Sequence, residues 1–113
     1  MSLDLTLYFE VDVGKDDKEW HTVFDANITH NLTEMADKAG IYELIWHPDR
    51  IGITKAEEIV DPLIEGIHKM ETDPIGFKKL NPENGWGSYD DFLPWLRDYL
   101  NACGEYSEAK IHT

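Results

Sequence analysis

The sequence predicts an α+β protein in which a small antiparallel sheet, an N-terminal hairpin plus a C-terminal strand, packs against three or four helices. Two observations carry this prediction. The N-terminal region alternates apolar and polar residues with a period of two, and later segments repeat apolar residues at helical spacing. The 113 residues fit a single domain over 1–113, since no repeat or linker-like tract divides them.

The hairpin is the first element along the chain. Residues 3–13 alternate almost perfectly, which predicts a strand with one buried face. Its apolar positions are Leu3, Leu5, Leu7, Phe9, Val11 and Val13. Residues 14–17 (Gly-Lys-Asp-Asp) predict a turn. Residues 20–26 then predict a second strand, with Trp20, Thr22, Phe24 and Ala26 on one face.

Four segments carry helical spacing: residues 32–39, 41–46, 59–67 and 89–103. Asn27 or Thr29 is expected to cap the first, and Gly40 to end it. A capping box at residues 54–57 is expected to start the third, and Pro62 to kink or restart it with Asp61 as the new cap.

The C-terminal part is predicted to contain a loop, a helix and a short strand. Residues 71–88 are rich in Pro, Gly and Asn, which is typical of a loop. Ser88 is expected to cap the last helix and Gly104 to end it. Residues 109–113 alternate again, so a final strand is expected to join the hairpin.

Charge is the unusual global property of the chain. It has 23 acidic and 10 basic residues, a net charge of −13. Such a surface is expected to avoid direct contact with nucleic acid and anionic membranes, and to attract a basic partner. Mimicry of a phosphate backbone is a second interpretation. The acids are spread along the chain, which favours simple solubility.

The setting is predicted to be cytoplasmic. The chain has one cysteine, Cys103, so it cannot form an internal disulfide. Its start lacks the basic and apolar regions of a signal peptide, and no apolar run reaches the ~18 residues of a membrane span.

The first candidate site is the polar run Asp25-Ala26-Asn27-Ile28-Thr29-His30-Asn31 at a strand-to-helix junction. Such junctions present side chains and backbone N–H groups to ligands. Asp25, Asn27, His30 and Asn31 are therefore candidate binding residues, with His30 as a base or metal ligand beside Asp25. The alternative is that they only cap the helix and form the turn.

The second candidate site is Asn81-Pro82-Glu83-Asn84-Gly85-Trp86-Gly87. Trp86, between two glycines and next to Asn84, offers a flat face for stacking on a ligand or partner. The alternative is a tryptophan that fills the core from a loop. The five histidines and the cysteine show no metal-binding spacing, and no cofactor motif occurs, so neither metal nor cofactor is expected.

These two runs, D-A-N-I-T-H-N-L at 25–32 and N-P-E-N-G-W-G at 81–87, resemble a group of small phage and prophage proteins. Shorter runs at 35–36, 39–42 and 99–103 extend the resemblance over nearly the whole chain. The resemblance implies a phage or bacterial cytoplasmic setting, and it implies no mechanism.

The sequence is therefore compatible with two functions. The first is a small acidic phage-type accessory protein that binds a host or phage protein. The alternative is a small enzyme or ligand-binding protein with a pocket between the 25–31 and 81–87 motifs, where His30 is the base and Trp86 the stacking wall. Catalytic residues stay unknown. Unprotected sheet edges leave a homodimer open.

Overall fold

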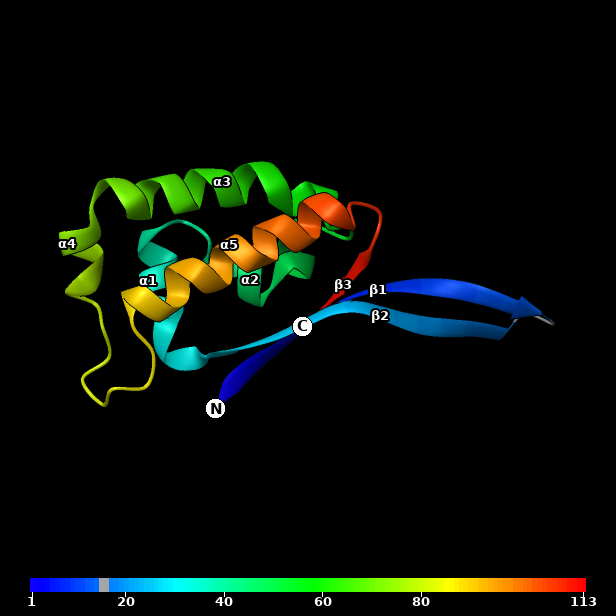
Figure 1. Ribbon diagram of the computed structural model, residues 1–113, viewed down its shortest axis with the longest axis horizontal. Coiled ribbons are helices and arrows are strands. Elements are labelled where there is room, and N and C mark those ends of the chain that lie inside the picture. The colour runs from blue at the N-terminus through cyan, green and yellow to red at the C-terminus, as the bar shows by residue number, and fades with distance from the viewer. Residues whose placement is uncertain (15–16) are drawn as a thin grey trace.

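The computed structural model describes residues 1–14 and 17–113, and it confirms the predicted α+β class (Figure 1). The sheet consists of β1 (Ser2–Gly14), β2 (Asp17–Thr29) and β3 (Lys110–His112). All pairings are antiparallel and the strand order is β2-β1-β3, so the C-terminal strand joins the hairpin as expected. Two residues of the predicted 14–17 turn, Lys15 and Asp16, lie outside the described residues.

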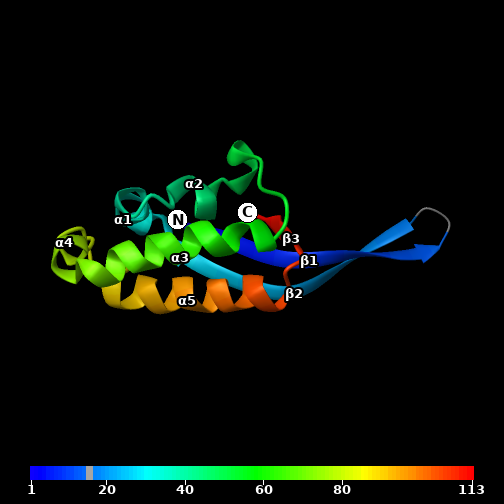
Figure 2. The same ribbon diagram turned by 90° about the horizontal axis from the view of Figure 1, so that it is seen from above.

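Five α-helices occur within the described residues: α1 (Thr33–Lys38), α2 (Tyr42–Trp46), α3 (Glu57–Thr72), α4 (Pro74–Lys78) and α5 (Tyr89–Glu105). Short 3₁₀ turns cover His30–Leu32 and Pro48–Ile51. The helices lie over one face of the sheet, with α3 and α5 packed side by side (Figures 1 and 2). No helix of the described residues covers the other face of the sheet.

The core lies between the sheet and this helical layer. Leu5 and Leu7 of β1 are fully buried, as are Phe92, Leu96 and Tyr99 of α5. The alternation of β1 and the helical spacing of α5 therefore meet on one apolar interface, as the sequence predicted. Burial of these large side chains is the main term that stabilises the fold.

Two predicted helix boundaries are wrong, and one short helix was missed. Of the two outcomes expected at Pro62, the restart at Asp61 does not occur, because α3 is one helix from Glu57 to Thr72, and α5 continues one residue past Gly104. Packing of α3 and α5 against each other outweighs these local breaking signals. At residues 71–88, α4 interrupts the predicted loop, because Asp73 Oδ1 accepts a hydrogen bond from Gly76 N at 3.1 Å.

The expected capping residues are partly replaced. Thr29 caps the first turn, since its hydroxyl accepts from Asn31 N at 3.2 Å, and Ser88 caps α5. Before α3, it is Glu58 rather than Glu57 that closes the turn. Its carboxylate accepts from Thr54 N at 3.2 Å and Lys55 N at 3.1 Å, and these two N–H groups lower the pKa of Glu58.

A β-bulge corrects the predicted facing of the second strand. Leu7 pairs with Phe24 and Tyr8 pairs with Thr22, so Val23 is an extra residue in β2. A one-residue shift moves side chains to the opposite face. Of the four residues predicted to share one face, Trp20 and Thr22 therefore lie on the uncovered face, and Phe24 and Ala26 face the core.

The tip half of the hairpin projects beyond the helices (Figures 1 and 2). Strand β3 pairs only with Thr6, Leu7 and Tyr8, so the described residues 9–14 and 17–21 form a two-stranded ribbon, called here the arm. The molecule extends 54 Å along its long axis and only 27 and 22 Å along the others.

Candidate functional site

The two predicted motifs meet in space. The loop 81–88 folds back against the junction between β2 and the first 3₁₀ turn. Gly87, at φ +96°, permits this approach, because a Cβ there would lie 2.7 Å from Thr29 Cγ2. Asn31 Nδ2 donates to the Trp86 carbonyl at 3.4 Å. An open pocket of about 570 Å³ results, called here the Trp86 groove. It is lined by Met1, Ser2, Asn27, Thr29, Asn31, Asn84 and Trp86.

The loop holds Trp86 by its main chain and leaves the indole exposed. Trp86 N donates to Asn84 Oδ1 at 2.9 Å, and the residue is 72% exposed. At the far end of the loop, Asn81 Oδ1 accepts from Tyr89 N at 2.8 Å. The Tyr89 hydroxyl donates to the Met70 carbonyl at 2.9 Å. The flat indole face is thus presented by a fixed loop instead of filling the core.

The side chains that line the groove are uncharged. Asn27 Nδ2 donates to Ser2 Oγ at 2.9 Å and to Asp4 Oδ1 at 2.6 Å, which leaves its amide oxygen available. The described lining contains neither lysine nor arginine. The groove therefore suits a neutral polar group stacked on Trp86, and its lining side chains offer no Lys or Arg to hold a phosphate.

His30 belongs to a different pocket. Its Nδ1 accepts a hydrogen bond from Trp46 Nε1 at 2.9 Å. Since an indole N–H only donates, the neutral imidazole must carry its hydrogen on Nε2. The lone pair of Nδ1 is thus engaged by the indole N–H, and His30 does not line the Trp86 groove, so it is not placed to act as a base there.

The second pocket, called here the histidine pocket, has a volume of about 560 Å³. It is lined by Ser2, Leu3, Asp4, Thr6, His30, Trp46, His47, Asp49, His112 and Thr113. The sequence did not indicate it, because its residues come from four separate segments. Across residues 1–14 and 17–113, no group of three or more His, Cys, Asp or Glu is arranged to hold a metal ion.

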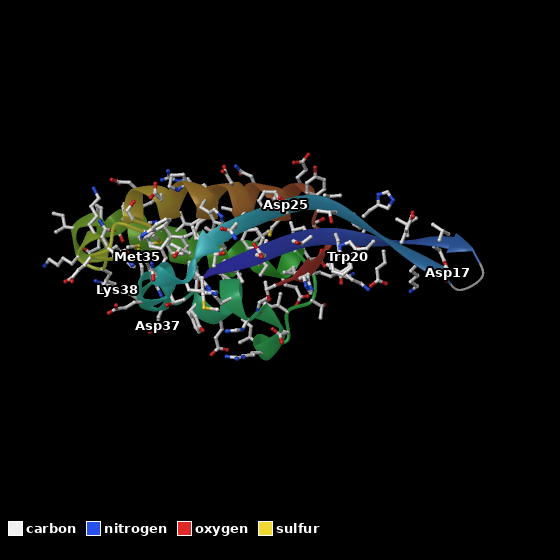
Figure 3. All side chains as sticks on the ribbon, turned by 90° about the horizontal axis from the view of Figure 1, so that it is seen from below. Asp17, Trp20, Asp25, Met35, Asp37 and Lys38 are labelled. Atoms are coloured by element: carbon white, nitrogen blue, oxygen red, sulfur yellow. The ribbon has the colours of Figure 1, made fainter. Side chains whose placement is uncertain are left out.

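Asp25 lines neither pocket. It is exposed on β2 and pairs with Thr6 of β1. Figure 3 shows Asp25 on β2 from the uncovered side of the sheet. Within the described residues, no hydrogen bond or ion pair joins Asp25 to His30. The structure thus brings Asn27, Asn31, Asn84 and Trp86 together, and it separates Asp25 and His30 from them.

The arm carries a further candidate surface that sequence reasoning missed. The apolar face of β1 is buried at Leu3, Leu5 and Leu7, then continues along the arm into solvent. Val11 is 41% exposed and Val13 is 56% exposed. The alternation predicted this apolar stripe, but it did not predict the residue at which the helices cease to cover it.

The opposite face of the arm is aromatic and charged. Trp20, half exposed, stacks on Tyr8 with ring centroids 3.8 Å apart, and His112 meets its ring edge-on at 5.2 Å. Glu10 pairs with Lys18 at 3.7 Å and with Lys110 at 3.2 Å. These contacts brace the base of the arm and leave its tip bare.

No family model, curated protein or solved structure matches this chain. What the fold defines is a class: a small α+β protein with a projecting two-stranded arm. Among the described helices, none is both long enough and apolar enough to cross a bilayer.

Proposed function

We propose that this protein is a binding protein whose arm docks on another protein. The observation that carries the proposal is the apolar stripe that leaves the core at Phe9 and continues bare over Val11 and Val13. A two-stranded ribbon is at best marginally stable in water unless something packs on it. Exposed apolar residues gathered on one projecting element are typical of an interaction surface.

The charge of the chain indicates the kind of partner. At a net charge of −13, the protein attracts a basic surface and repels an acidic one. Glu19 is exposed directly opposite Val11 of the apolar stripe, and Asp12 and Asp17 are exposed near the tip of the arm. A partner with an apolar patch rimmed by Lys or Arg fits both features. The resemblance to phage proteins supports an accessory factor that engages such a host or phage protein in the cytoplasm.

The test is capture from bacterial lysate with matched variants. Val11→Thr with Val13→Thr keeps shape and strand preference while making the stripe polar. Ile75→Thr changes a residue that is 74% exposed on α4, at the end of the molecule away from the arm. We expect one basic protein to be retained at low salt, released at high salt, lost by the arm variant and kept by Ile75→Thr.

Two outcomes would count against the proposal. One is capture that the arm variant leaves unchanged. The other is a stable homodimer, seen by sedimentation, that the arm variant converts to monomer, because a second copy would then cover the stripe.

A second candidate function rests on the Trp86 groove, as a site for a neutral polar ligand. Asn27, Asn31, Asn84 and Trp86 converge on it although they come from segments far apart in the chain. NMR titration with uncharged sugars, following the Asn side-chain amides and the Trp86 indole N–H, tests this. Trp86→Ala should abolish any shift that wild type and Ile75→Ala both show. The separation of Asp25 and His30 from the groove favours binding there over catalysis.

A further inference from the structure

An unpaired stretch of sheet edge opens into the histidine pocket. Strand β3 pairs with β1 only from Thr6 to Tyr8. Toward the N-terminus, β1 continues for Ser2 to Leu5 with β2 on one side and no strand on the other. Ser2, Leu3 and Asp4 line the histidine pocket, which therefore lies where a longer third strand would run.

The register shows which backbone groups face this pocket. His30 N donates to Met1 O at 3.2 Å, in the same register that pairs Leu3 with Ile28 and Leu5 with Ala26. Odd-numbered residues of β1 therefore bond to β2. In an antiparallel ladder the alternate residues point the other way. Thr6 meets His112 of β3, whereas the N–H and C=O groups of Ser2 and Asp4 point into the pocket.

Backbone groups of Ser2 and Asp4 have no hydrogen-bond partner within the described residues. Around them the pocket carries two carboxylates, Asp4 and Asp49, and its described lining includes neither Lys nor Arg. Because Trp46 donates to Nδ1 of His30, the imidazole carries its hydrogen on Nε2. This N–H is a further hydrogen-bond donor in the lining of the pocket. A volume of about 560 Å³ accommodates a few residues of extended chain.

We propose that an extended basic segment of a partner protein adds to this edge as a continuation of β3. The segment would run antiparallel to β1, exchange hydrogen bonds with Ser2 and Asp4, and place Lys or Arg side chains toward Asp4 and Asp49. The inference rests on the proposed protein-binding function, but it names a surface distinct from the arm. A second copy fits poorly, since pairing two such edges would bring four carboxylates together.

The probe is a six-residue peptide of alternating lysine and valine, capped at both ends. Its control has the same side chains, but the amides that face β1 are N-methylated. We expect the unmethylated peptide to shift the Ser2 and Asp4 amide resonances and slow their hydrogen exchange. N-methylation should weaken binding about tenfold or more, because each methyl removes a backbone donor.

Two variants separate charge from backbone pairing. Asp4→Asn removes the carboxylate and keeps the N–H, whereas Asp4→Pro removes both at a position where the N–H faces away from β2. We expect Asp4→Asn to weaken binding about threefold and Asp4→Pro at least tenfold. Val11→Thr with Val13→Thr should leave peptide affinity unchanged. The experiment on the β1 edge can therefore fail without bearing on the proposed docking of the arm, and the reverse is also true.

The inference is overturned if the methylated and unmethylated peptides bind equally, or if neither binds. It is equally overturned if Ser2 and Asp4 amides are already protected from exchange in a dimer of the free protein. Should Asp4→Pro not fold, the comparison between the two peptides on the wild-type protein still decides the matter.

Discussion

Gly87 is the residue on which the Trp86 groove depends. Its φ of +96° disfavours any L side chain, and a Cβ would meet Thr29 and Leu32. Gly85 has a similar φ of +77° but nothing within 4 Å of its Cβ position. The two glycines share a positive φ and differ in steric contact, so an alanine at each would be equally strained but only the one at 87 would clash. The difference between the two variants therefore measures how tightly the loop packs on the junction.

We predict that Gly87→Ala destabilises the protein by about 2–4 kcal/mol, because backbone strain and a clash add. Gly85→Ala should cost only about 1–2 kcal/mol, from strain alone. Urea unfolding of both variants provides the comparison. Equal losses would show that the loop does not press on Thr29 and Leu32 in solution.

His30 is a structural acceptor, which gives a test that separates its two ring nitrogens. Asn places an acceptor oxygen close to the position of Nδ1, whereas Gln places it near Nε2. We predict that His30→Asn keeps the bond from Trp46 Nε1 and most of the stability. His30→Gln and His30→Ala should each lose about 1–3 kcal/mol, because the indole N–H of the buried Trp46 is left unpaired. Thermal unfolding of the three variants checks the order; a more stable Gln variant would contradict the assigned tautomer.

At the scale of elements, the strongest periodic patterns were the most predictive. The alternation of β1 and the helical spacing of α5 each extend over many residues, and both elements formed where expected. The bulge at Val23 was missed because a single extra residue leaves the local composition unchanged. Helix α4 was missed because its five residues include Pro74 and Gly76, and its start depends on one Asp73 hydrogen bond.

The buried face of α5 also makes a prediction about pH. Burial raises the pKa of the Cys103 thiol from 9.0 to about 12. Between those values the unfolded chain binds fewer protons at this site than the native chain, so stability falls as pH rises. Below pH 9 both states keep the proton and the site contributes no pH dependence.

We predict that the free energy of unfolding declines from pH 9 upward, with Cys103 contributing up to about 1.4 kcal/mol per pH unit. The buried Tyr99, whose pKa burial also raises, adds to the decline at higher pH. Urea titrations at pH 8 to 10 measure the slope. Cys103→Ala should be less stable at pH 8 but decline less steeply, and an unchanged slope would exclude the thiol as its source.

At the scale of the whole molecule, the sequence could place the Trp86 groove only in part. The shared polar character of the two motifs suggested Asn27, Asn31, Asn84 and Trp86, and the fold brings these together. The position of His30 depends on Trp46 of α2, a tertiary contact that no local pattern reveals. The exposed apolar face of the arm could not be predicted for a similar reason. Alternation shows which face of a strand is apolar, but it does not show how much of that face the helices cover.

Net charge is the property of the whole molecule that outweighs its individual ion pairs. Six ion pairs of Lys or Arg and one His21–Glu19 contact, charged only when the imidazole is protonated, join described residues. All involve side chains that stay at least 33% exposed, so each contributes little. Repulsion among the excess acids acts over the screening length, which falls from about 30 Å at 0.01 M salt to about 10 Å at 0.1 M. Added salt should therefore remove more repulsion than attraction.

We predict that the melting temperature rises between 10 and 300 mM NaCl, where a gain of about 1 kcal/mol corresponds to roughly 4–8 °C in a domain of this size. The matched variant is Asp61→Lys with Glu65→Lys, two exposed positions on α3 that take the net charge from −13 to −9. It should melt higher than wild type at 10 mM NaCl and respond less to added salt. A melting temperature that falls with salt would mean that the surface ion pairs dominate. The acidic excess would then not destabilise the fold. Attraction of a basic partner would no longer be needed to explain why so many acidic residues are present.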